Sequence, residues 1–596
     1  MDDFIFGSMD TEALRVEHHR RSHLHISHLS GRSPRDPLPG QPVNLTVSVG
    51  AAESAAAAWI YFTSDGSDPV GSLGKATHGQ VVGMRRAGAE WDDITWGFTH
   101  TWSGALPGQQ GQTIVRYRIG VQIADGTEVF ADEGAYYAYC VDTFAPPDWS
   151  RDAVIYHILV DRFARGGGRP WNEVASIDEI YGGDLSGILE RLDYLQQLGV
   201  NTLYLSPIFP CPNHHRYNAT DYFGIDPVVG TQADFRRLLD TLHARGMRLI
   251  LDFVPNHWSD QHATFQSAIS DPNSPYRDWY TFTHYPDEYE CFFNVRSMPK
   301  INLRNPDARK YMCDAAAYWL NFGVDGLRLD YSIGPAPDFW ADFRLATRKA
   351  NPDCWVFGEV VDSPNAQIVF TGLLDGCLDF LLLEAFRQTF ATRQWNAGKF
   401  AAFLAGHFSQ FPPEFSRPAF LDNHDMDRFL WAAGGNAEAL KLAALCQFTL
   451  PGAPLIYYGT EVGLSQERAT RDRRGGFGKL EEARLPMPWG AGQNEDLLQY
   501  YRQLAALRQR EKALRRGGWE LESFSTNAIA YRRSIGEDRL LIVLNLSPEN
   551  CDFPIPPEFD RLIFTTPTGP ADIPIPAGSL QLHPCSGAVL RCGRQA

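Results

Sequence analysis

The feature that most constrains the fold is an alternation of apolar and helical segments that begins near Val154. The apolar segments are rich in β-branched and aromatic residues and too continuously apolar for a half-exposed sheet, which is typical of parallel strands buried on both faces. Helical segments such as 185–199 and 305–323 lie between them. We therefore predict an α/β fold, a closed (β/α)8 TIM barrel. An open doubly wound sheet is not favoured, because no GxGxxG opens a helix after the first strand. The eight predicted strands are AVIYHILV, NTLYLSPIF, MRLILDFVPNH, VDGLRLD, CWVFGEV, CLDFLLLE, RPAFLDNHD and PLIYYGTE.

The rest of the chain predicts further domains, because 596 residues exceed what a single core of about 250 to 300 residues holds. Short alternating runs in 24–145 predict an N-terminal β-sandwich, immunoglobulin-like and a candidate for carbohydrate binding. The barrel is expected over 146–514, with an inserted subdomain at 258–304 after the third strand, since that interval is too long for a βα loop. A C-terminal β-sandwich is expected over 515–594.

Composition excludes several classes of partner. The net charge of −17 with no Lys/Arg-rich block argues against nucleic acid as a partner. The sequence contains no uninterrupted run of about 18 apolar residues, so no membrane span is predicted. A neutral polymer would not be repelled. The segment 1–21 carries acids where a secretory signal has basic residues and an apolar run, which predicts a cytoplasmic location.

Polar residues gather where the predicted strands end. The carboxyl ends of barrel strands face the active site, so these side chains should converge on one rim. A lone carboxylate is best explained as a helix cap or a surface ion pair, but several acids brought together repel one another and indicate a functional site. The strand-end residues are Asp252, Asn256 and His257, then Arg328 and Asp330, then Glu359, and finally His424 and Asp425.

Two carboxyl groups on neighbouring strands fit glycoside hydrolysis. A retaining mechanism needs a pair about 5 to 5.5 Å apart. Arg328 should lower the pKa of Asp330 and keep it ionised, whereas like charges and limited solvation should raise the pKa of Glu359. A zinc hydrolase is not favoured, because no HxH or HExxH spacing is present, and no GxSxG elbow supports a serine nucleophile.

Four motifs in this order resemble the α-amylase family of glycoside hydrolases: DFVPNH (252–257), GLRLD (326–330), GEV (358–360) and FLDNHD (420–425). The resemblance covers about 24–594. It implies that Asp330 is the nucleophile, Glu359 the general acid/base and Asp425 a third acid that grips ring hydroxyls. It also implies substrate binding by a further set of residues, Asp252, His257, Arg328 and His424.

Two more segments narrow the resemblance. HRYNATDYF (215–223) looks like the loop in which Tyr217 stacks beneath the sugar and Asp221 orders the loop, although Tyr217 could simply be a packing residue. SMPKIN (297–302) is similar to a signature of the neopullulanase, cyclomaltodextrinase and maltogenic amylase branch. The branch implies a retaining hydrolase of α-1,4-glucosidic bonds in maltooligosaccharides, starch or cyclodextrins, and a homodimer whose N-terminal sandwich covers the partner's active site. A transglycosylase on the same barrel and a non-catalytic carbohydrate-binding protein are the alternatives.

The sequence also departs from that branch. YSIG (331–334) follows the nucleophile position where a small pair and Asn-Glu are usual, and Val361 follows GEV where Trp is common. Many relatives bind calcium through the residue at Asn256, but the loop ARGGGRPWN (164–172) lacks the Asn/Asp series that binds calcium in this branch. We expect no metal and no cofactor to be required.

Overall fold

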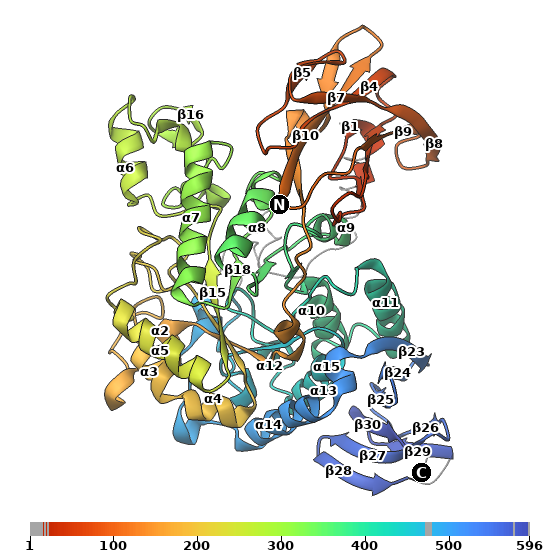
Figure 1. The fold of residues 1–596 in the computed structure, drawn as a ribbon. Coiled ribbons are helices and arrows are strands. Elements are labelled where there is room, and N and C mark those ends of the chain that lie inside the picture. Colours follow the sequence, from red (N-terminus) through yellow and green to blue (C-terminus); the bar gives the residue numbers. More distant parts are fainter. Residues whose placement is uncertain (1–15, 17–18, 21–22, 471–478, 576–577, 594–596) are drawn as a thin grey trace.

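The structure, a computed structural model, describes residues 16, 19–20, 23–470, 479–575 and 578–593. Its centre is a parallel eight-stranded sheet with the strand order β20-β19-β18-β15-β14-β13-β22-β21, surrounded by helices (Figure 1). The strands are β13 (Ile155–Ile158), β14 (Thr202–Leu205), β15 (Arg248–Phe253), β18 (Gly326–Leu329), β19 (Trp355–Gly358), β20 (Gly376–Cys377), β21 (Ala419–Phe420) and β22 (Pro454–Tyr457).

The two end strands of this sheet meet and close it. The backbone N–H of Cys377 donates to the carbonyl of Ser416 at 3.0 Å, and that of Asp379 donates to the carbonyl of Pro418 at 3.0 Å. Since β20 and β21 are the ends of the strand order, these bonds complete the ring. The predicted (β/α)8 barrel is confirmed.

Helices cover the outside of the barrel. The 185–199 segment, expected as one helix, is divided at Arg191 into α3 and α4. The principal helices around the sheet are α3 (Leu185–Glu190), α4 (Leu192–Leu198), α5 (Gln232–Ala244), α7 (Pro306–Phe322), α8 (Phe339–Ala350), α10 (Phe380–Phe386), α11 (Ala397–Gln410), α13 (Ala437–Thr449) and α14 (Glu495–Arg510). None of the described helices is long and apolar enough to cross a membrane.

The sixth predicted strand is largely wrong. CLDFLLLE was expected as a strand, but pairing stops at Cys377 and the apolar residues form α10. The Asp379 side chain accepts the backbone N–H of Leu382 at 2.9 Å and caps this helix. A short continuous apolar run fits a buried helix as well as a buried strand, so periodicity could not separate the two.

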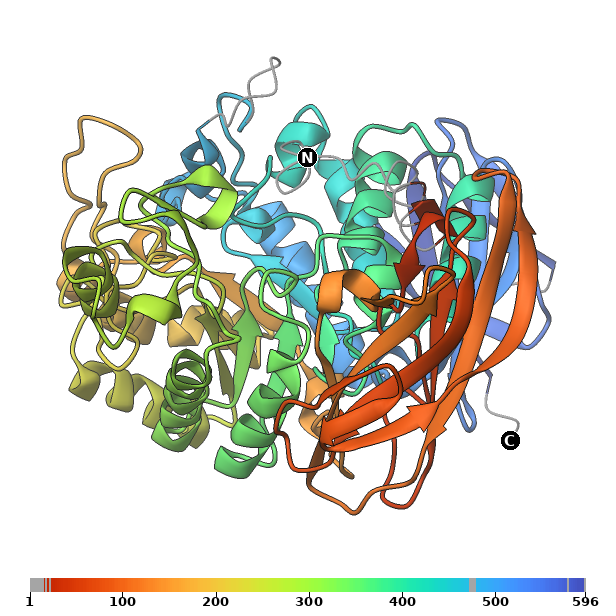
Figure 2. The same cartoon turned by 90° about the horizontal axis from the view of Figure 1, so that it is seen from above.

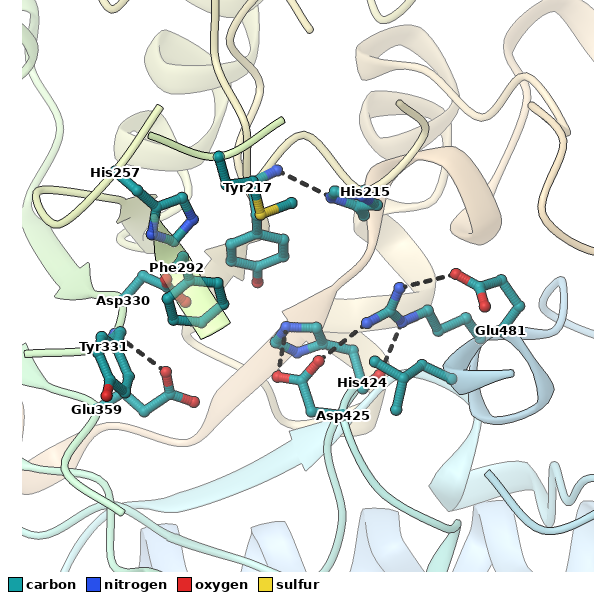
Figure 3. A pocket seen from close by; sticks show the side chains of 13 residues that line it. His215, Tyr217, His257, Phe292, Asp330, Tyr331, Glu359, His424, Asp425 and Glu481 are labelled. Carbon is teal, nitrogen blue, oxygen red and sulfur yellow. Dashed lines mark hydrogen bonds and ion pairs between the residues drawn. The ribbon is translucent and has the colours of Figure 1, made fainter. Parts of the chain in front are cut away.

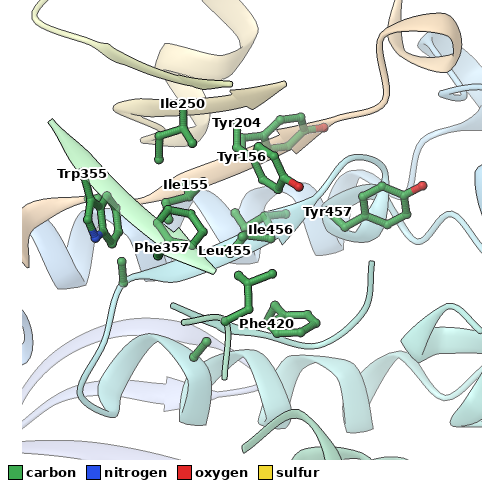
Figure 4. Close-up of a cluster of buried hydrophobic side chains, with 14 of the residues drawn as sticks. Ile155, Tyr156, Tyr204, Ile250, Trp355, Phe357, Phe420, Leu455, Ile456 and Tyr457 are labelled. Atoms are coloured by element: carbon green, nitrogen blue, oxygen red, sulfur yellow. The ribbon is translucent and has the colours of Figure 1, made fainter. Parts of the chain in front are cut away.

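The barrel interior is filled by large apolar side chains (Figure 4). Ile155, Ile250 and Phe357 come from different strands and lie together in it. The barrel is therefore a packed core, and polar chemistry is confined to the strand ends.

The segment after the third strand carries small elements of its own. They are α6 (Ala263–Ser270), β16 (Phe282–His284) and β17 (Glu288–Tyr289). The segment returns to the barrel through residues 297–302, where the backbone N–H of Ile301 donates to the carbonyl of Asn256 at 2.9 Å. This contact brings the inserted segment against the third strand end.

Two five-stranded sheets precede the barrel. Their buried faces share one core, to which Val47 of the first sheet and Ile60 of the second contribute. The first sheet holds β1 (Ile26–Ser27), β2 (Arg32–Ser33), β3 (Val43–Val49), β8 (Arg85–Asp92) and β9 (Gly97–Leu106), and the second holds β4 (Ala55–Thr63), β7 (Gln80–Gly83), β10 (Thr113–Ile123), β11 (Glu128–Phe130) and β12 (Tyr137–Val141).

Antiparallel sheets also follow the barrel. A six-stranded sheet packs one face on the barrel helices, with Tyr531 and Ile542 in the barrel's own core cluster, and the other face on the pair β26–β29. The strands are β23 (Gly518–Phe524), β24 (Ala528–Ile535), β25 (Asp538–Asn545), β27 (Phe559–Thr566), β28 (Gly569–Pro574) and β30 (Ser586–Cys592), with β26 (Cys551–Ile555) and β29 (Gly578–Leu582). Flanking β domains on both sides of the barrel agree with the prediction.

The N-terminal sheets lie at one side of the barrel, close to α8 (Figures 1 and 2). Ion pairs form at this contact: Arg116 Nη1 of β10 lies 2.6 Å from Asp338 Oδ2 of the barrel, and Arg309 Nη2, from the barrel itself, lies 2.8 Å from the same oxygen. We call this group the junction cluster; it consists of Arg116, Arg304, Arg309, Asp68, Asp338 and Asp342.

Candidate active site

A cavity of about 200 Å³ opens at the carboxyl ends of the barrel strands (Figure 3). Most of the predicted strand-end residues line it, because parallel strands end at the same rim. The lining residues are His215, Tyr217, His257, Phe292, Met298, Asp330, Tyr331, Glu359, His424, Asp425, Leu480, Glu481 and Arg484.

A single buried guanidinium lies beneath the acids. Arg328, on β18, is completely buried, and its Nη1 donates to Asp252 Oδ1 at 2.8 Å and to Asp330 Oδ1 at 2.9 Å. Its Nη2 lies 2.6 Å from Glu359 Oε1. Four carboxyl oxygens from three residues thus surround one cation, and we call Arg328, Asp252, Asp330 and Glu359 the catalytic cluster.

The negative charges in this cluster outnumber the positive one. Burial raises the pKa of Asp330 well above its usual value, and Glu359 adds to the shift while Arg328 opposes it. Arg328 does lower the pKa of Asp330, as expected, but desolvation and the neighbouring carboxylate outweigh it, so that the net shift is upward instead of downward. Burial also raises the pKa of Glu359, as predicted.

The two carboxyl groups titrate as a pair. With both pKa values raised, the pair retains one proton over a range in which free carboxyl groups would have lost both. Arg328 donates a hydrogen bond to Asp330, and the backbone N–H of Tyr331 donates to Glu359 Oε2 at 3.1 Å. Each carboxyl group thus has one hydrogen bond that favours its charged form, and the retained proton belongs to the pair.

Asp425 has different partners. Its Oδ2 lies 3.0 Å from His424 Nε2, and its Oδ1 accepts from Arg484 Nη2 at 2.9 Å. Although burial by itself would raise it, His424 and Arg484 hold the pKa of Asp425 below its usual value. This third acid is therefore ionised over the range in which the pair of Asp330 and Glu359 keeps one proton.

Tyr217 lies in the cavity, in the loop after β14. Its ring stacks on that of His424 with centroids 5.0 Å apart and an interplanar angle of 5°. Its hydroxyl donates to Asp252 Oδ2 at 2.8 Å. Asp252 lies behind the cavity wall, so it fixes Arg328 and Tyr217 rather than facing the cavity.

His257 and Asp221 differ in position. His257 lines the cavity and stacks on Phe292 with centroids 4.3 Å apart, and burial lowers its pKa to about 3, which leaves the ring neutral. Its Nε2 is buried with no hydrogen-bond partner in the described part of the chain. Asp221 does not line the cavity; its Oδ1 accepts the backbone N–H of Phe223 at 2.9 Å, a local turn bond.

Several cavity residues were not predicted from the sequence. Arg484 and Glu481 follow the eighth strand, at the end of a long segment with no strand-end pattern, and Arg484 Nη1 lies 3.1 Å from Glu481 Oε1. Phe292 comes from the inserted segment. The only signal for Tyr331 was its place directly after Asp330, noted as a departure from the branch.

The site offers little for a metal. Within the described ranges no group of three or more His, Cys, Asp or Glu side chains could hold one. The Oδ1 of Asn256 is buried without a hydrogen-bond partner there, but one amide oxygen falls far short of the six to eight oxygen ligands that calcium takes. The residues present do not fit the calcium site implied by the resemblance, and no step below uses a metal.

A barrel with two coupled carboxyl groups and a third, ionised acid at its strand ends belongs to the class of barrel enzymes that cleave glycosidic bonds. The family profile described as "Alpha amylase, catalytic domain" matches residues 157–517. The chain belongs to the alpha-amylase family and is a glycoside hydrolase of the cyclomaltodextrinase and neopullulanase type.

Individual relatives agree with this assignment. The chain is 39% identical to "Alpha-amylase 2" of Dictyoglomus thermophilum over 70% of this chain and 73% of that protein. It is 35% identical to "Neopullulanase 2" of Thermoactinomyces vulgaris over 74% and 77%, and 33% identical to "Intracellular maltogenic amylase" of Bacillus subtilis over 69% and 71%. A solved structure titled "Cyclomaltodextrinase" matches with a TM-score of 0.69 at 26% identity, covering 95% of this chain and 99% of that one.

Proposed function

We propose that the protein is a retaining hydrolase that cleaves α-1,4-glucosidic bonds in maltooligosaccharides, starch or cyclodextrins through a covalent glycosyl-enzyme. The observation that carries the proposal is the pair Asp330 and Glu359, which share Arg328 at one cavity and retain one proton between them. A retaining glycosidase needs one carboxylate to attack and one carboxylic acid to donate.

In the first step Asp330 attacks the anomeric carbon, while Glu359 gives its proton to the leaving oxygen. Arg328 balances the charge that remains on the cluster. In the second step the Glu359 carboxylate takes a proton from water, whose oxygen attacks the same carbon and releases Asp330. Both steps invert the carbon, so the product keeps the α configuration.

The other cavity residues bind the reacting sugar in this proposal. Tyr217 offers a ring to the apolar face of the sugar, and Asp425 accepts hydrogen bonds from ring hydroxyls. His424 and the neutral His257 hydrogen-bond to sugar hydroxyls. Asp252 supports Arg328 and Tyr217 from behind, and Asp221 keeps the loop of Tyr217 in shape.

The mechanism is tested by the configuration of the first product. NMR of freshly cleaved maltotriose should show the α anomer before mutarotation; an initial β anomer would exclude the covalent intermediate. Glu359→Gln should lose most activity on maltotriose yet keep much more on an aryl α-maltoside with a good leaving group, which needs little acid catalysis. Equal losses on the two substrates would contradict the role of Glu359.

The substrate class is tested by release of reducing ends from β-cyclodextrin, soluble starch and pullulan side by side. A preference for β-cyclodextrin would support a hydrolase that cleaves cyclodextrins. Formation of longer products favours the second candidate, an α-glucan transglycosylase, which shares the glycosyl-enzyme and differs in what intercepts it. Binding without turnover would favour a non-catalytic carbohydrate-binding protein. Such a protein has no need of three clustered acids, which is why this alternative is not favoured.

We also propose domain bounds of 24–145 for the N-terminal sheets, 146–514 for the barrel with its inserted subdomain over 258–304, and 515–594 for the last domain.

We further propose a role for the N-terminal sheets. Trp91, Trp96 and Phe98, around the β8–β9 turn, are 49%, 82% and 53% exposed. Exposed rings suit glucan binding or a homodimer contact. Trp96→Ala should weaken retention on a starch affinity gel in the first case, and light scattering should show loss of a dimer in the second.

A cytoplasmic location is proposed as well. One relative is named an intracellular enzyme. Fractionation of cells that produce the protein tests this; activity in the culture medium would contradict it.

A further inference from the structure

We propose that Tyr331, braced by Phe292 and Phe293, forms an aromatic platform that binds the glucosyl residue of the leaving group, and afterwards of an incoming sugar acceptor. The proposal rests on the proposed function, because it takes Glu359 as the acid that protonates the leaving oxygen. It assigns a specificity role to a residue at which this chain departs from its branch.

The platform lies on the acid side of the cavity. The backbone N–H of Tyr331 donates to Glu359 Oε2 at 3.1 Å. Figure 3 shows Tyr331, Phe292 and Glu359 together on one side, with His424 and Asp425 across the cavity. Since the general acid must contact the leaving oxygen, the sugar beyond the scissile bond lies on the side of Tyr331.

The three rings support one another. Tyr331 meets Phe292 at a centroid distance of 4.9 Å and Phe293 at 5.3 Å, with interplanar angles of 78° and 72°. Phe292 also stacks on His257, which ties the platform to the third strand end. All three rings are partly exposed, and Phe292 and Tyr331 line the cavity, so apolar ring surface is available to the C–H groups of a sugar.

The backbone holds these rings in uncommon conformations. Tyr331 has φ 41° and Phe293 has φ 46°, a region that bulky residues rarely adopt. The turn after Asp330 is pinned to the fifth strand, because the backbone N–H of Ser332 donates to the carbonyl of Glu359 at 2.9 Å. Two strained aromatic residues from separate segments that meet beside the acid fit a functional constraint.

The same platform bears on the fate of the glycosyl-enzyme. When a sugar hydroxyl attacks the anomeric carbon, the bond to Asp330 breaks, the Asp330 carboxylate is released and the hydroxyl proton passes to the Glu359 carboxylate. A sugar held on Tyr331 presents such a hydroxyl on the acid side. The platform should therefore favour sugar acceptors over water.

The test compares two substrates that differ only in the leaving group. Maltotriose has a glucose leaving group that would occupy the platform, whereas fluoride leaving from α-maltosyl fluoride would not. Tyr331→Ala should lower kcat/KM for maltotriose by roughly tenfold and for α-maltosyl fluoride by less than about twofold. Tyr331→Phe should stay near wild type, and Phe293→Ala should show a weaker version of the same split.

Val295→Ala is the matched control, since Val295 lies in the same segment but does not line the cavity. Equal losses on both substrates, or no loss on maltotriose, would overturn the platform while leaving the hydrolase intact. If Tyr331→Ala does not fold, Phe293→Ala and Tyr331→Leu decide by the same ratio. A wild-type protein that converts neither substrate would instead refute the proposed function itself.

Discussion

The catalytic cluster and the junction cluster both bury aspartates against arginines, but their charges are balanced differently. In the junction cluster three arginines meet three aspartates, and the completely buried Asp338 has ion pairs with all three arginines. In the catalytic cluster one arginine meets three carboxyl groups. Where buried positive and negative charges balance, removing one partner lowers the stability of the fold. Where buried acidic groups outnumber their basic partners, the excess charge itself lowers stability. Matched charge therefore marks a structural role here, and mismatched charge marks the chemistry.

The largest expected effect is in the catalytic cluster. Asp330→Asn should lower kcat on maltotriose by roughly 10⁴-fold or more, because the nucleophile is lost. The variant should nevertheless be at least as stable as wild type. A carboxyl group whose pKa is raised on folding destabilises the fold as pH rises from its unfolded value towards its folded one, and the amide removes that penalty.

Thermal unfolding at pH 5 and at pH 8 checks the second part. The gain in stability of Asp330→Asn over wild type should be larger at pH 8. Wild-type turnover in this variant would refute the assignment of the nucleophile, and a marked loss of stability would refute the surplus-charge argument.

The junction cluster should respond in the opposite sense. Asp338→Asn leaves buried guanidinium groups short of their shared partner and should cost about 3 to 5 kcal/mol in the free energy of unfolding. Turnover per folded molecule should change little, since Asp338 does not line the cavity. Urea unfolding followed by activity assays on the folded fraction measures both.

Asp314→Asn is a control, because the Asp314 carboxylate is 54% exposed and, among the described residues, has an ion pair only with Lys310 of the same helix. It should leave the unfolding midpoint nearly unchanged. An equally small effect of Asp338→Asn would show that the junction is not a matched cluster.

Sequence patterns predicted the parts of the molecule that depend on periodic, local order. Continuous apolar strands predicted the barrel, and Asp330 and Glu359 followed because strand ends in a barrel converge. The junction cluster could not be predicted, since Arg116 and Asp338 are 222 residues apart and meet only through domain packing. Arg484 likewise reaches the site from a loop whose path no local pattern fixes. The sixth strand was predicted wrongly because its apolar run is short. Such a run shows no periodicity that could distinguish a buried helix from a buried strand.

The next largest effect is expected at Arg484. It tests whether the charge of Asp425 is balanced by a basic partner, as the charges of the junction cluster are. Arg484 donates to Asp425 and also, from Nε, to the carbonyl of His424 at 2.7 Å. Arg484→Gln removes the charge and should lower kcat/KM on maltotriose by roughly 30-fold, about 2 kcal/mol. Arg484→Lys should recover part of the loss, since it restores charge without the fork. A wild-type rate in Arg484→Gln would show that the charge of Arg484 does not contribute to turnover and that its side chain only fills space.

The smallest expected effect is in the pH profile. We expect kcat/KM for maltotriose to be bell-shaped, with an alkaline limb where the Asp330 and Glu359 pair loses its last proton. Burial and the neighbouring acids disfavour the second negative charge, so this limb should lie above the ordinary Glu value of 4.5. A limb at the ordinary value would mean that the surplus acid does not perturb Glu359.

α-Maltosyl fluoride separates the two limbs, because fluoride needs no proton to leave. For glycosyl-enzyme formation from this substrate the alkaline limb should vanish, while the acidic limb, at which Asp330 becomes protonated, remains. Asp338→Asn should keep the wild-type profile on both substrates despite its lower stability, since the junction charges lie outside the cavity. If instead its limbs shifted with those of the site, the two clusters would be electrostatically coupled, and charge balance in one would help to set the protonation of the other.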